Sequence, residues 1–409
     1  METLKFLMVS THFPPQHLGG DAGFVELLSR ELIRRGHEVH VFHSPASYEL
    51  LREARPIVPD ESADGGLRRH PFHSRLGRLY PVIELSLGFM GTAENSLKEL
   101  TRNLKPDIVH WHNTKGFIGR PFASDEALCL HTAHDYTTVC PRSNLLRPDM
   151  SICQTPKLCT VCHLRWHKPP QLWRAGRKRR VVSIPEQMKV LSVSDFVATR
   201  LRQDGIRVHK VIRGFVPDHG GNIRRDSSSP DTIVYLGLLE YHKGVLQLLD
   251  AFFKTRNEQG FKLTMIGEGS LKGELKRRVE KRRLSDRVSI PGFISRDEVD
   301  ATRRNAAAQV VPSIWYENAP SVILEAYSLG LPVIASDIGG LPEIVGPDSG
   351  SLLFPMGDVD RLASLIVDAW LTRDSLNDRR RMARRTYETR FSPDIHVGQY
   401  LRTISDLAR

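Results

Sequence analysis

The most informative stretch of this chain is Pro312-Ser-Ile-Trp-Tyr-Glu-Asn-Ala-Pro-Ser-Val-Ile-Leu-Glu-Ala-Tyr-Ser-Leu-Gly330. We expect a strand to end near Pro312 and a loop to follow it. Pro320 suits the first turn of a helix, and Gly330 suits the C-terminal cap of the same helix. The N–H groups that open this helix and its positive dipole end predict a binding site for phosphate.

Two glutamates, Glu317 and Glu325, lie eight positions apart in this stretch. Glu317 precedes the helix, whereas Glu325 lies inside it between the apolar residues Leu324 and Ala326. A carboxylate in such a helix is costly unless it accepts hydrogen bonds. Ribose hydroxyls are suitable donors, and the structural alternative for Glu325 taken alone is that it pairs with a buried arginine or caps a backbone group. The spacing of the two acids favours a functional role for both.

Short apolar strands alternate with amphipathic helices along almost the whole chain. In residues 24–35, for example, Phe24, Leu28 and Leu32 fall on one helix face. Such alternation predicts an α/β fold with two doubly wound, Rossmann-like parallel sheets, each covered by helices on both faces. The expected strands are Leu4–Ser10, Glu38–Ser44, Asp107–His112, Leu128–His134, Val190–Ser194, Thr232–Leu236, Phe261–Ile266, Arg287–Pro291, Gln309–Val311, Pro332–Ser336 and Ser351–Phe354.

The length of 409 residues is too great for one ordinary core and suits two domains. The break between them is predicted at residues 219–231, which are rich in glycine, serine and charge. We therefore expect a first domain at 1–218, with an insert at about 137–182, and a second domain at 232–391. Two such domains that face each other across a cleft bind ligands at the carboxyl ends of their strands.

Composition narrows the class of protein. No run of 18 or more apolar residues occurs, which argues against a transmembrane helix. The first residues do not form a secretory signal, because the apolar stretch is short and Glu2 lies within it, so we expect a cytoplasmic protein. The formal net charge of +11 attracts nucleic acid, anionic lipid headgroups or phosphorylated small molecules, and does not choose among them.

The spacing of Glu317 and Glu325 resembles the Glu-x7-Glu motif of glycosyltransferase family 4, whose fold is GT-B. The resemblance covers nearly the whole chain. Further matching segments are Ser336-Asp-Ile-Gly-Gly-Leu-Pro-Glu343, Gly267-Glu-Gly269, Pro291-Gly-Phe-Ile294, Gly237 to Lys243-Gly244, Pro14-Pro15 with Gly19-Gly20, and Arg35-Gly-His-Glu-Val39. Residues 392–409 resemble the family's C-terminal helix, which packs back on the first domain.

This resemblance implies a retaining glycosyltransferase that moves a sugar from a nucleotide-diphosphate sugar to a glycan or lipid-linked acceptor, in cell-surface polysaccharide or glycolipid synthesis. In that case Glu325 binds the ribose, Glu317 lies near the transferred sugar, and Lys243 neutralises the diphosphate. Catalysis then needs no metal cofactor, since lysine is itself a compact cation. The other expected donor-binding residues are Gly19, Gly20, Gly237, Gly267, Phe293, Asn318, Ala319, Pro320 and Ser321.

One position departs from the family pattern. The family usually has arginine directly after the first glycine of the segment that begins at Gly237, and this chain has Leu238. An arginine fork on the diphosphate is then missing, at a cost of roughly 1.5–3 kcal/mol per charged hydrogen bond if nothing replaces it. The alternative function is therefore a catalytically weak or inactive protein that binds sugar nucleotides or polysaccharide.

In the first domain, His134 and the pair Gly19-Gly20 are the main candidates. His134 follows a predicted strand and resembles the family histidine that faces the donor sugar, although a lone histidine is more often structural. Gly19-Gly20 permits close approach of the backbone to phosphate or sugar, and a simple turn is the alternative. Asp135, next to His134, is expected to cap the following turn.

The predicted insert contains four cysteines in the order Cys140-x12-Cys153-x5-Cys159-x2-Cys162. A C-x2-C pair with two more thiols nearby fits a tetrahedral structural zinc site. Reduced, unbound cysteines are an equally reasonable interpretation, and a disulfide or redox role is a third. Cys129, on a predicted strand, is expected to belong to the core.

A basic stretch, Arg165–Arg180, follows the cysteines and carries seven Lys or Arg residues, no acid, and Trp166 and Trp173. Such a segment lies on an anionic membrane surface, grips a phosphorylated acceptor, or forms a solvated basic helix. No nucleic-acid fold signature accompanies it, so we expect no nucleic-acid partner.

Overall fold

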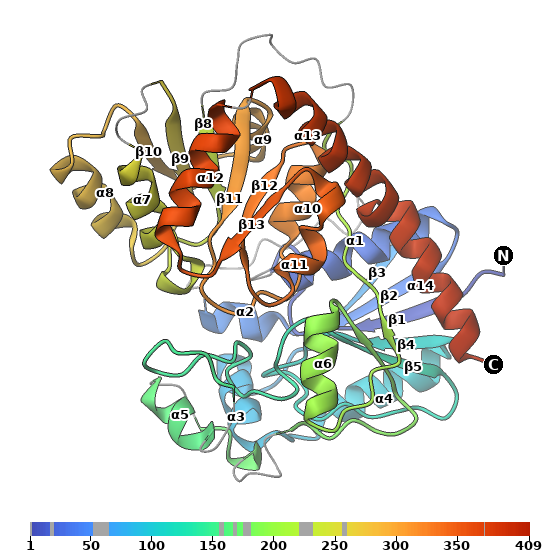
Figure 1. Cartoon of the computed structure of the whole chain (residues 1–409). Helices are drawn as coiled ribbons and strands as arrows, with labels where there is room; N and C mark the ends of the chain where they lie inside the picture. The colour runs from blue at the N-terminus through green and yellow to red at the C-terminus, as the bar shows by residue number, and fades with distance from the viewer. Residues whose placement is uncertain are drawn as a thin grey trace. The chain divides into compact units, whose positions relative to one another are not determined.

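The computed structural model of the chain describes residues 2–16, 20–51, 65–154, 159–166, 170–174, 181–220, 232–255, 260–371 and 373–409. It divides into two compact units, each built on its own sheet (Figure 1). The first unit comprises Met1–Gly214 and His396–Arg409, and the second comprises Phe215–Ile395. Most of the predicted linker, residues 221–231, lies outside the described residues.

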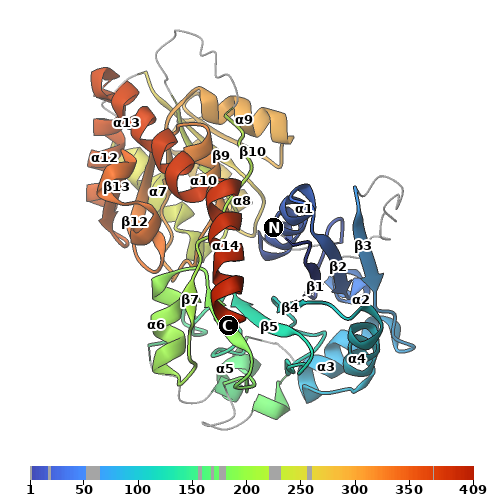
Figure 2. The same cartoon turned by 90° about the vertical axis from the view of Figure 1, so that its right-hand side faces the viewer.

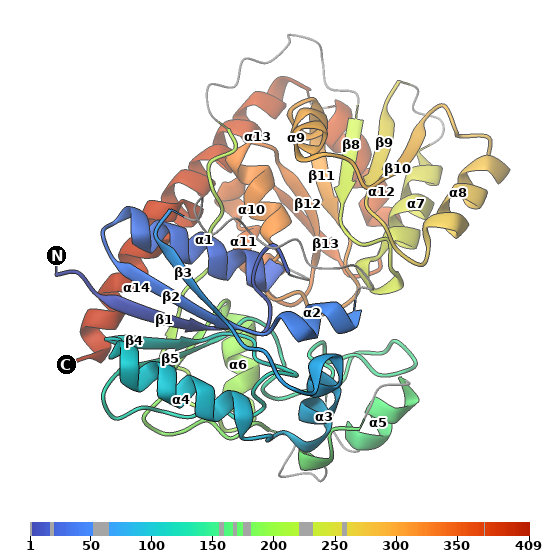
Figure 3. The same cartoon turned by 180° about the vertical axis from the view of Figure 1, so that it is seen from behind.

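The first unit contains a seven-stranded parallel sheet in the order β3-β2-β1-β4-β5-β6-β7 (Figure 3). Because β1 lies between β2 and β4, the strand order reverses beside β1, as in doubly wound sheets. The strands are β1 (Lys5–Val9), β2 (Glu38–His43), β3 (Leu67–Pro71), β4 (Ile108–Trp111), β5 (Leu128–Ala133), β6 (Lys189–Ser192) and β7 (Lys210–Val211). The helices are α1 (Gly20–Arg34), α2 (Pro45–Leu51), α3 (Tyr80–Leu87), α4 (Thr92–Leu104), α5 (Cys159–Arg165) and α6 (Asp195–Gln203), with short 3₁₀ turns at Gly77–Leu79 and Leu172–Arg174.

The second unit contains a six-stranded parallel sheet in the order β10-β9-β8-β11-β12-β13. The strands are β8 (Thr232–Leu236), β9 (Lys262–Ile266), β10 (Val288–Gly292), β11 (Ala306–Val311), β12 (Val333–Asp337) and β13 (Leu352–Pro355). The helices are α7 (Val245–Lys254), α8 (Lys272–Lys281), α9 (Arg296–Arg304), α10 (Ser321–Ser328), α11 (Leu341–Ile344), α12 (Val359–Leu371) and α13 (Arg373–Thr386), with 3₁₀ turns at Tyr241–Lys243 and Pro347–Ser349 and a π-helical turn at Tyr387–Phe391. The predicted fold class, two doubly wound parallel-sheet domains, is confirmed.

Each sheet is covered by helices, so the central strands are buried on both faces. All six residues of β11 are buried, and so are all four of β4. Strands in this position have almost continuous apolar sequences, which is why the sequence revealed them. In the first unit Trp111 and Phe117 contribute to the core, and in the second unit Phe252 and Met265 do so.

The last helix, α14 (Pro393–Leu407), contributes His396 and the residues after it to the first unit (Figure 2). The Tyr400 hydroxyl and His110 Nδ1 share a buried hydrogen bond of 2.7 Å, and the two rings are stacked. His396 Nδ1 lies 2.7 Å from the carbonyl oxygen of Arg213. Among the helices of the described ranges, none combines the length and apolar composition needed to cross a membrane.

Candidate active site

The carboxyl ends of the central strands of the second sheet carry most of the residues expected to bind the donor. Gly237 directly follows β8, Gly267 follows β9, and Phe293 follows β10. The loop that leaves β11 carries Glu317 to the start of α10. These loops meet at one edge because the strands are parallel, and this edge is where open α/β sheets bind ligands.

Glu317 is buried, and three groups donate hydrogen bonds to its Oε1 atom. They are Lys243 Nζ at 2.7 Å, Ser313 Oγ at 2.6 Å and Trp315 Nε1 at 2.8 Å. Burial alone would raise the pKa of Glu317, but the adjacent Lys243 ammonium and these hydrogen bonds outweigh it and bring the pKa below its usual value. The side chain is therefore an ionised carboxylate held in one orientation.

Lys243 ends a 3₁₀ turn that follows β8, and its ammonium lies 4.8 Å from the centre of the Trp315 ring. The backbone here approaches the β11 loop closely, because Gly244 has a φ of 70° and a Cβ atom on it would lie 1.8 Å from the Pro312 carbonyl oxygen. Lys243 thus pairs with Glu317 in this structure. A bound diphosphate would share the ammonium with that carboxylate.

Glu325 forms an ion pair with a buried arginine, which is the structural alternative that the sequence left open. Arg303 has an exposed fraction of 0% and donates from NH1 to Glu325 Oε2 at 2.8 Å. It also donates to Gln309 Oε1 at 3.0 Å and to the Val322 carbonyl oxygen at 3.2 Å. Arg303, on α9, was not identified from sequence because its partner lies 22 residues away on another helix. The pair fixes one carboxylate oxygen of Glu325, so its role toward a ribose stays a prediction.

A close contact between two loops positions Glu317. The Gly340 N–H donates to the Glu317 carbonyl oxygen at 2.7 Å. Cβ atoms on Gly339 and Gly340 would lie 2.6 Å from that oxygen and 2.0 Å from the Asn318 carbonyl oxygen, respectively. The Gly-Gly pair after β12 therefore permits a backbone approach that any side chain would block.

The rim of this edge exposes apolar side chains. Phe293 is 86% exposed and Leu238 is 56% exposed. Both loops contact Glu268: the Phe293 N–H donates to its Oε1 at 3.3 Å, and the Leu239 N–H donates to its carbonyl oxygen at 2.8 Å. Leu238 therefore places an exposed apolar side chain where the family usually has arginine.

The residues that precede α10 lie where the sequence predicted them. Pro320 is the N-cap of α10, Ser321 is its first residue, and Asn318 and Ala319 lie in the loop before it. Gly330 follows the C-cap with a φ of 63°. Gly20 opens α1 in the first unit and is exposed, whereas Gly19 lies outside the described residues.

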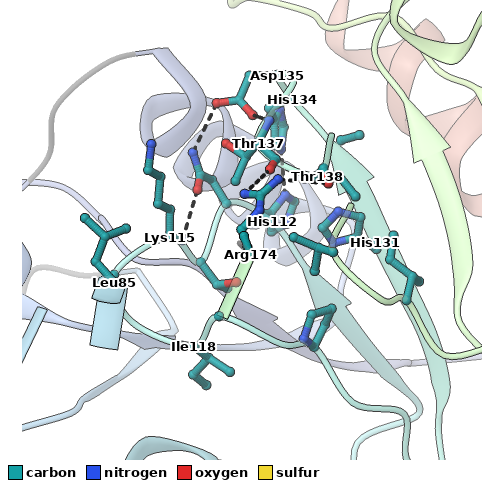
Figure 4. A pocket seen from close by; sticks show the side chains of 18 of the residues that line it. Leu85, His112, Lys115, Ile118, His131, His134, Asp135, Thr137, Thr138 and Arg174 are labelled. Carbon is teal, nitrogen blue, oxygen red and sulfur yellow. Dashed lines mark hydrogen bonds between the residues drawn. The ribbon is translucent and has the colours of Figure 1, made fainter. Parts of the chain in front are cut away.

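A pocket in the first unit gathers titratable side chains at the ends of β4 and β5 (Figure 4). His134 lies in it beside His112, whose Nδ1 atom is 2.9 Å from His134 Nε2. Burial lowers the pKa of His134 to about 4, against the opposing effect of Asp21. Burial also lowers the pKa of His112, and His110 and His134 contribute. Both rings are therefore neutral near pH 7, and each fixes the orientation of the other.

Other walls of the same pocket are polar and were missed from sequence. Lys115 Nζ donates to the Pro141 carbonyl oxygen at 2.8 Å, and burial lowers its pKa to about 8. Buried Glu84 accepts the Gly119 N–H at 2.7 Å, and burial raises its pKa to about 7. These residues come from three separate segments, so no local motif marks them. Asp135 accepts the Thr137 N–H at 2.6 Å and thus caps the turn, as expected.

The basic stretch Arg165–Arg180 is only partly described, since 167–169 and 175–180 lie outside the described residues. In its described part, the side chains of Trp173 and Arg174 point toward the protein and make hydrogen bonds there. Arg174 is 2% exposed and donates to the carbonyl oxygens of Thr137 and Thr138 at 2.8 and 3.2 Å. The Trp173 indole N–H donates to the Leu85 carbonyl oxygen at 3.1 Å. These two residues form part of the pocket wall rather than a solvated basic face.

The four cysteines of the insert, Cys140, Cys153, Cys159 and Cys162, line one cavity, and no disulfide joins them within the described residues. In the part of the chain that the structure describes, no three His, Cys, Asp or Glu side chains are already arranged to hold a metal ion. Cys129 lies on β5 and is buried in the first core.

Two family models match most of the chain. The model described as Glycosyltransferase Family 4 matches residues 18–216, and the model described as Glycosyl transferases group 1 matches residues 222–389. The two matches thus fall almost entirely on separate structural units.

Relatives and solved structures agree with these matches. Glycogen synthase of Mycobacterium tuberculosis is 27% identical over 367 residues, which cover 84% of this chain and 80% of that protein. The MMP alpha-(1->4)-mannosyltransferase of Mycolicibacterium hassiacum is 28% identical over 375 residues, 86% of this chain and 85% of that protein. The crystal structure of Anabaena HepE in complex with UDP has a TM-score of 0.66 at 17% identity and covers 98% of this chain and 100% of its own. The chain is therefore a member of glycosyltransferase family 4 with the GT-B fold, and it is an enzyme that transfers glycosyl groups.

Proposed function

We propose that this enzyme transfers a sugar, with retention of the anomeric configuration, from a nucleoside-diphosphate sugar to a glycan or lipid-linked acceptor. The observation that carries the proposal is the position of Glu317. It is an ionised, buried carboxylate, fixed by Lys243, Ser313 and Trp315 immediately before the N-terminus of α10. A carboxylate and an ammonium beside a helix N-terminus suit a sugar diphosphate, whose phosphates are anionic and whose sugar presents hydroxyls.

In the proposed reaction, the bond between the sugar C1 atom and the diphosphate oxygen breaks, and the acceptor oxygen forms a bond to C1 on the same face. The departing diphosphate takes the proton of the acceptor hydroxyl. Lys243 and the backbone N–H groups of Asn318, Ala319 and Ser321 stabilise the negative charge on the leaving group. Glu317 accepts hydrogen bonds from the transferred sugar, and Glu325 accepts one from the ribose. HepE, a structural neighbour of this chain, was solved in complex with UDP, which supports a nucleotide-sugar donor.

His134 contributes from the first unit. As a neutral imidazole it is a hydrogen-bond partner for a sugar hydroxyl, and it adds no charge at pH 7. The acceptor is proposed to interact mainly with the first unit. We also propose that the protein acts at an anionic membrane surface, in cell-surface polysaccharide or glycolipid synthesis, through residues of Arg165–Arg180 other than Trp173 and Arg174, which line the pocket. Co-sedimentation with anionic but not neutral vesicles supports the membrane part, and equal binding to both contradicts it.

The test of the proposal is a panel of uridine, guanosine and adenosine diphosphate sugars. We expect one nucleotide class to release its diphosphate when acceptor is present, and nuclear magnetic resonance of the product to show the donor's anomeric configuration. An inverted product overturns the retaining mechanism.

The exposed Leu238 favours a second candidate, a protein that binds sugar nucleotides with little or no turnover. Saturable binding of one nucleotide sugar without diphosphate release would support that candidate instead.

A further inference from the structure

Four thiols from three local segments of the insert line the same cavity in the first unit. Its volume is about 420 Å³, and Cys140, Cys153, Cys159 and Cys162 all contribute to its wall. The fifth cysteine of the chain, Cys129, does not line this cavity and lies buried on β5. The cavity therefore collects the four cysteines of the insert and leaves out the core cysteine.

Each thiol is carried by a locally defined segment. Cys140 closes a turn, because its N–H donates to the Tyr136 carbonyl oxygen at 2.7 Å. Cys153 ends a small hairpin, in which its N–H donates to the Leu145 carbonyl oxygen at 2.6 Å. Cys159 and Cys162 lie one helical turn apart at the start of α5, so their side chains are on the same face of that helix. A turn, a hairpin and a helix thus each present thiols to one space.

Arginine side chains are part of the same cavity wall. Arg142, Arg147 and Arg165 line the same cavity as the four cysteines. Four thiolates around a divalent ion carry a net charge of −2, which nearby guanidinium groups offset. The Arg142 guanidinium is also held in place, with its carbon 4.3 Å from the centre of the Trp166 ring.

We propose that the insert binds one zinc ion through the thiolates of Cys140, Cys153, Cys159 and Cys162. Four thiolates in a tetrahedral arrangement are a standard structural zinc site, and a C-x2-C pair is its usual core. Binding releases the four thiol protons and draws the sulfurs together to zinc–sulfur distances of about 2.3 Å. This closure is required, because the described thiols line the cavity without yet being arranged at ligand distance.

The proposed zinc site stabilises one wall of the histidine pocket. Pro141, next to Cys140, accepts hydrogen bonds from Lys115 Nζ at 2.8 Å and from Gln171 Nε2 at 3.1 Å, and both of these residues line the pocket. A metal that holds Cys140 in place would therefore also hold the neighbouring Pro141 carbonyl group, to which Lys115 donates a hydrogen bond. The zinc is structural and takes no part in the transfer step, so the inference stands or falls independently of the proposed reaction.

The experiment is metal analysis of the full chain, purified under reducing conditions without chelator. We expect about one zinc per chain, released in proportion to thiol modification by a mercurial reagent, as for structural zinc held by four thiolates. Replacement of the zinc by Co²⁺ is expected to give the visible absorption bands of tetrahedral thiolate coordination. Cys159→Ser/Cys162→Ser should lose the metal, whereas Cys129→Ala removes a thiol outside the cavity and should keep it.

Three results would overturn the proposal: wild-type protein that contains no stoichiometric metal and four free thiols in the insert, a disulfide among these cysteines in the metal-free chain, or stoichiometric iron with cluster absorption. The wild-type measurements decide the matter even if the double variant does not fold. If the wild-type protein contained its zinc but transferred no sugar, the proposed function would be contradicted and the proposed zinc site would not.

Discussion

Glu317 shows how three neighbours make a buried carboxylate tolerable. Charge-assisted hydrogen bonds are about twice as strong as neutral ones, and Lys243 supplies one while Ser313 and Trp315 supply two more to the same oxygen. The sequence predicted that Glu317 and Lys243 act in one site. It did not predict that they pair directly, because the contact spans 74 residues. Trp315 and Ser313 lie two and four residues from Glu317 in the same stretch, but the sequence predicted no role for either.

The pairing of His112 with His134 gives the first prediction, which rests on the proposed role of His134. We expect His112→Phe to lower kcat by roughly 10- to 100-fold with a small change in donor KM, because the His134 ring loses the partner that fixes its orientation. His112→Asn, which keeps a hydrogen-bonding side chain, should recover part of the loss. Steady-state kinetics of both variants provide the measurement.

The control for His112 is His73→Gln, a change at an exposed histidine in the same unit. It should leave kcat and KM unchanged. Equal kcat for His112→Phe and the wild type would show that His134 needs no positioning by His112. A rise in donor KM with kcat unchanged would assign His112 a structural role only.

At the scale of elements, strands with apolar runs were predictable, whereas a polar edge strand and a two-residue strand were not. Strand β8 begins and ends as predicted, and β1, β2, β4, β5, β9, β10, β12 and β13 differ from their predictions by one residue at one or both ends. Strand β6 ends two residues earlier than predicted, and β11 begins three residues earlier. Strand β3, Leu-Arg-Arg-His-Pro, was missed because it is an edge strand with polar residues, and β7 was missed because it has two residues. A strand paired on one side needs less apolar surface, so its sequence resembles a loop.

The contact between the β12–α11 turn and the Glu317 loop gives the second prediction. Gly340→Ala should reduce transfer activity and lower the melting temperature, because its Cβ would lie 2.0 Å from the Asn318 carbonyl oxygen and would move the loop that carries Glu317. The backbone φ of Gly340 is −83°, so the effect comes from the contact and not from backbone strain. Calorimetry and kinetics of the purified variant measure both effects.

The matched control is Gly273→Ala in helix α8, where the nearest atom to a new Cβ is Arg277 NH1 at 3.5 Å. Alanine there should be neutral or should stabilise the helix by up to about 1 kcal/mol. If Gly340→Ala behaved like Gly273→Ala, the Gly-Gly pair would have no part in positioning Glu317.

At the scale of the whole molecule, the buried histidines of the first unit predict a pH dependence of stability. Burial lowers the pKa of His43 to about 3 and that of His396 to about 4, and His131 and His134 are likewise lowered to about 4. These groups stay neutral in the fold but take up protons on unfolding below about pH 6.5. Stability is therefore fully retained above pH 6.5 and falls as the pH drops toward 4, by roughly 1.4 kcal/mol per pH unit for one fully buried group.

Glu84 acts in the opposite direction. Burial raises its pKa to about 7, so the destabilisation that it causes is relieved as the pH falls from 7 toward its usual value. Because four histidines destabilise the fold as the pH falls and only Glu84 opposes them, we expect the melting temperature to decrease between pH 7 and pH 5. Scanning calorimetry measures this decrease. The slope should become shallower in His43→Leu and stay the same in Glu280→Gln, a change at an exposed glutamate of helix α8. A melting temperature that does not change over this range would contradict the burial of neutral histidines.

Candidate site residues could be identified from the sequence where they lie close together in the chain, and were missed where the fold brings distant segments together. The Glu317–Glu325 stretch and the glycines after β8 and β9 were found because each motif lies within a few residues of a strand end. Arg303 and Glu84 were not, because their partners Glu325 and Gly119 lie 22 and 35 residues away in the sequence. Leu238 was found as a departure, and its exposure agrees with a place at the rim.

The most direct test of the account compares Glu317→Gln with Glu280→Gln, a change at an exposed glutamate of helix α8. The measurement is the rate of sugar transfer from the nucleotide sugar that the panel identifies, with circular dichroism to establish that each variant is folded. Glu317→Gln should reduce kcat by at least about 100-fold, the usual magnitude for a group that stabilises the transition state electrostatically. Glu280→Gln should transfer at the wild-type rate. Transfer by folded Glu317→Gln at a rate near that of the wild type would remove Glu317 from the reaction and contradict the account.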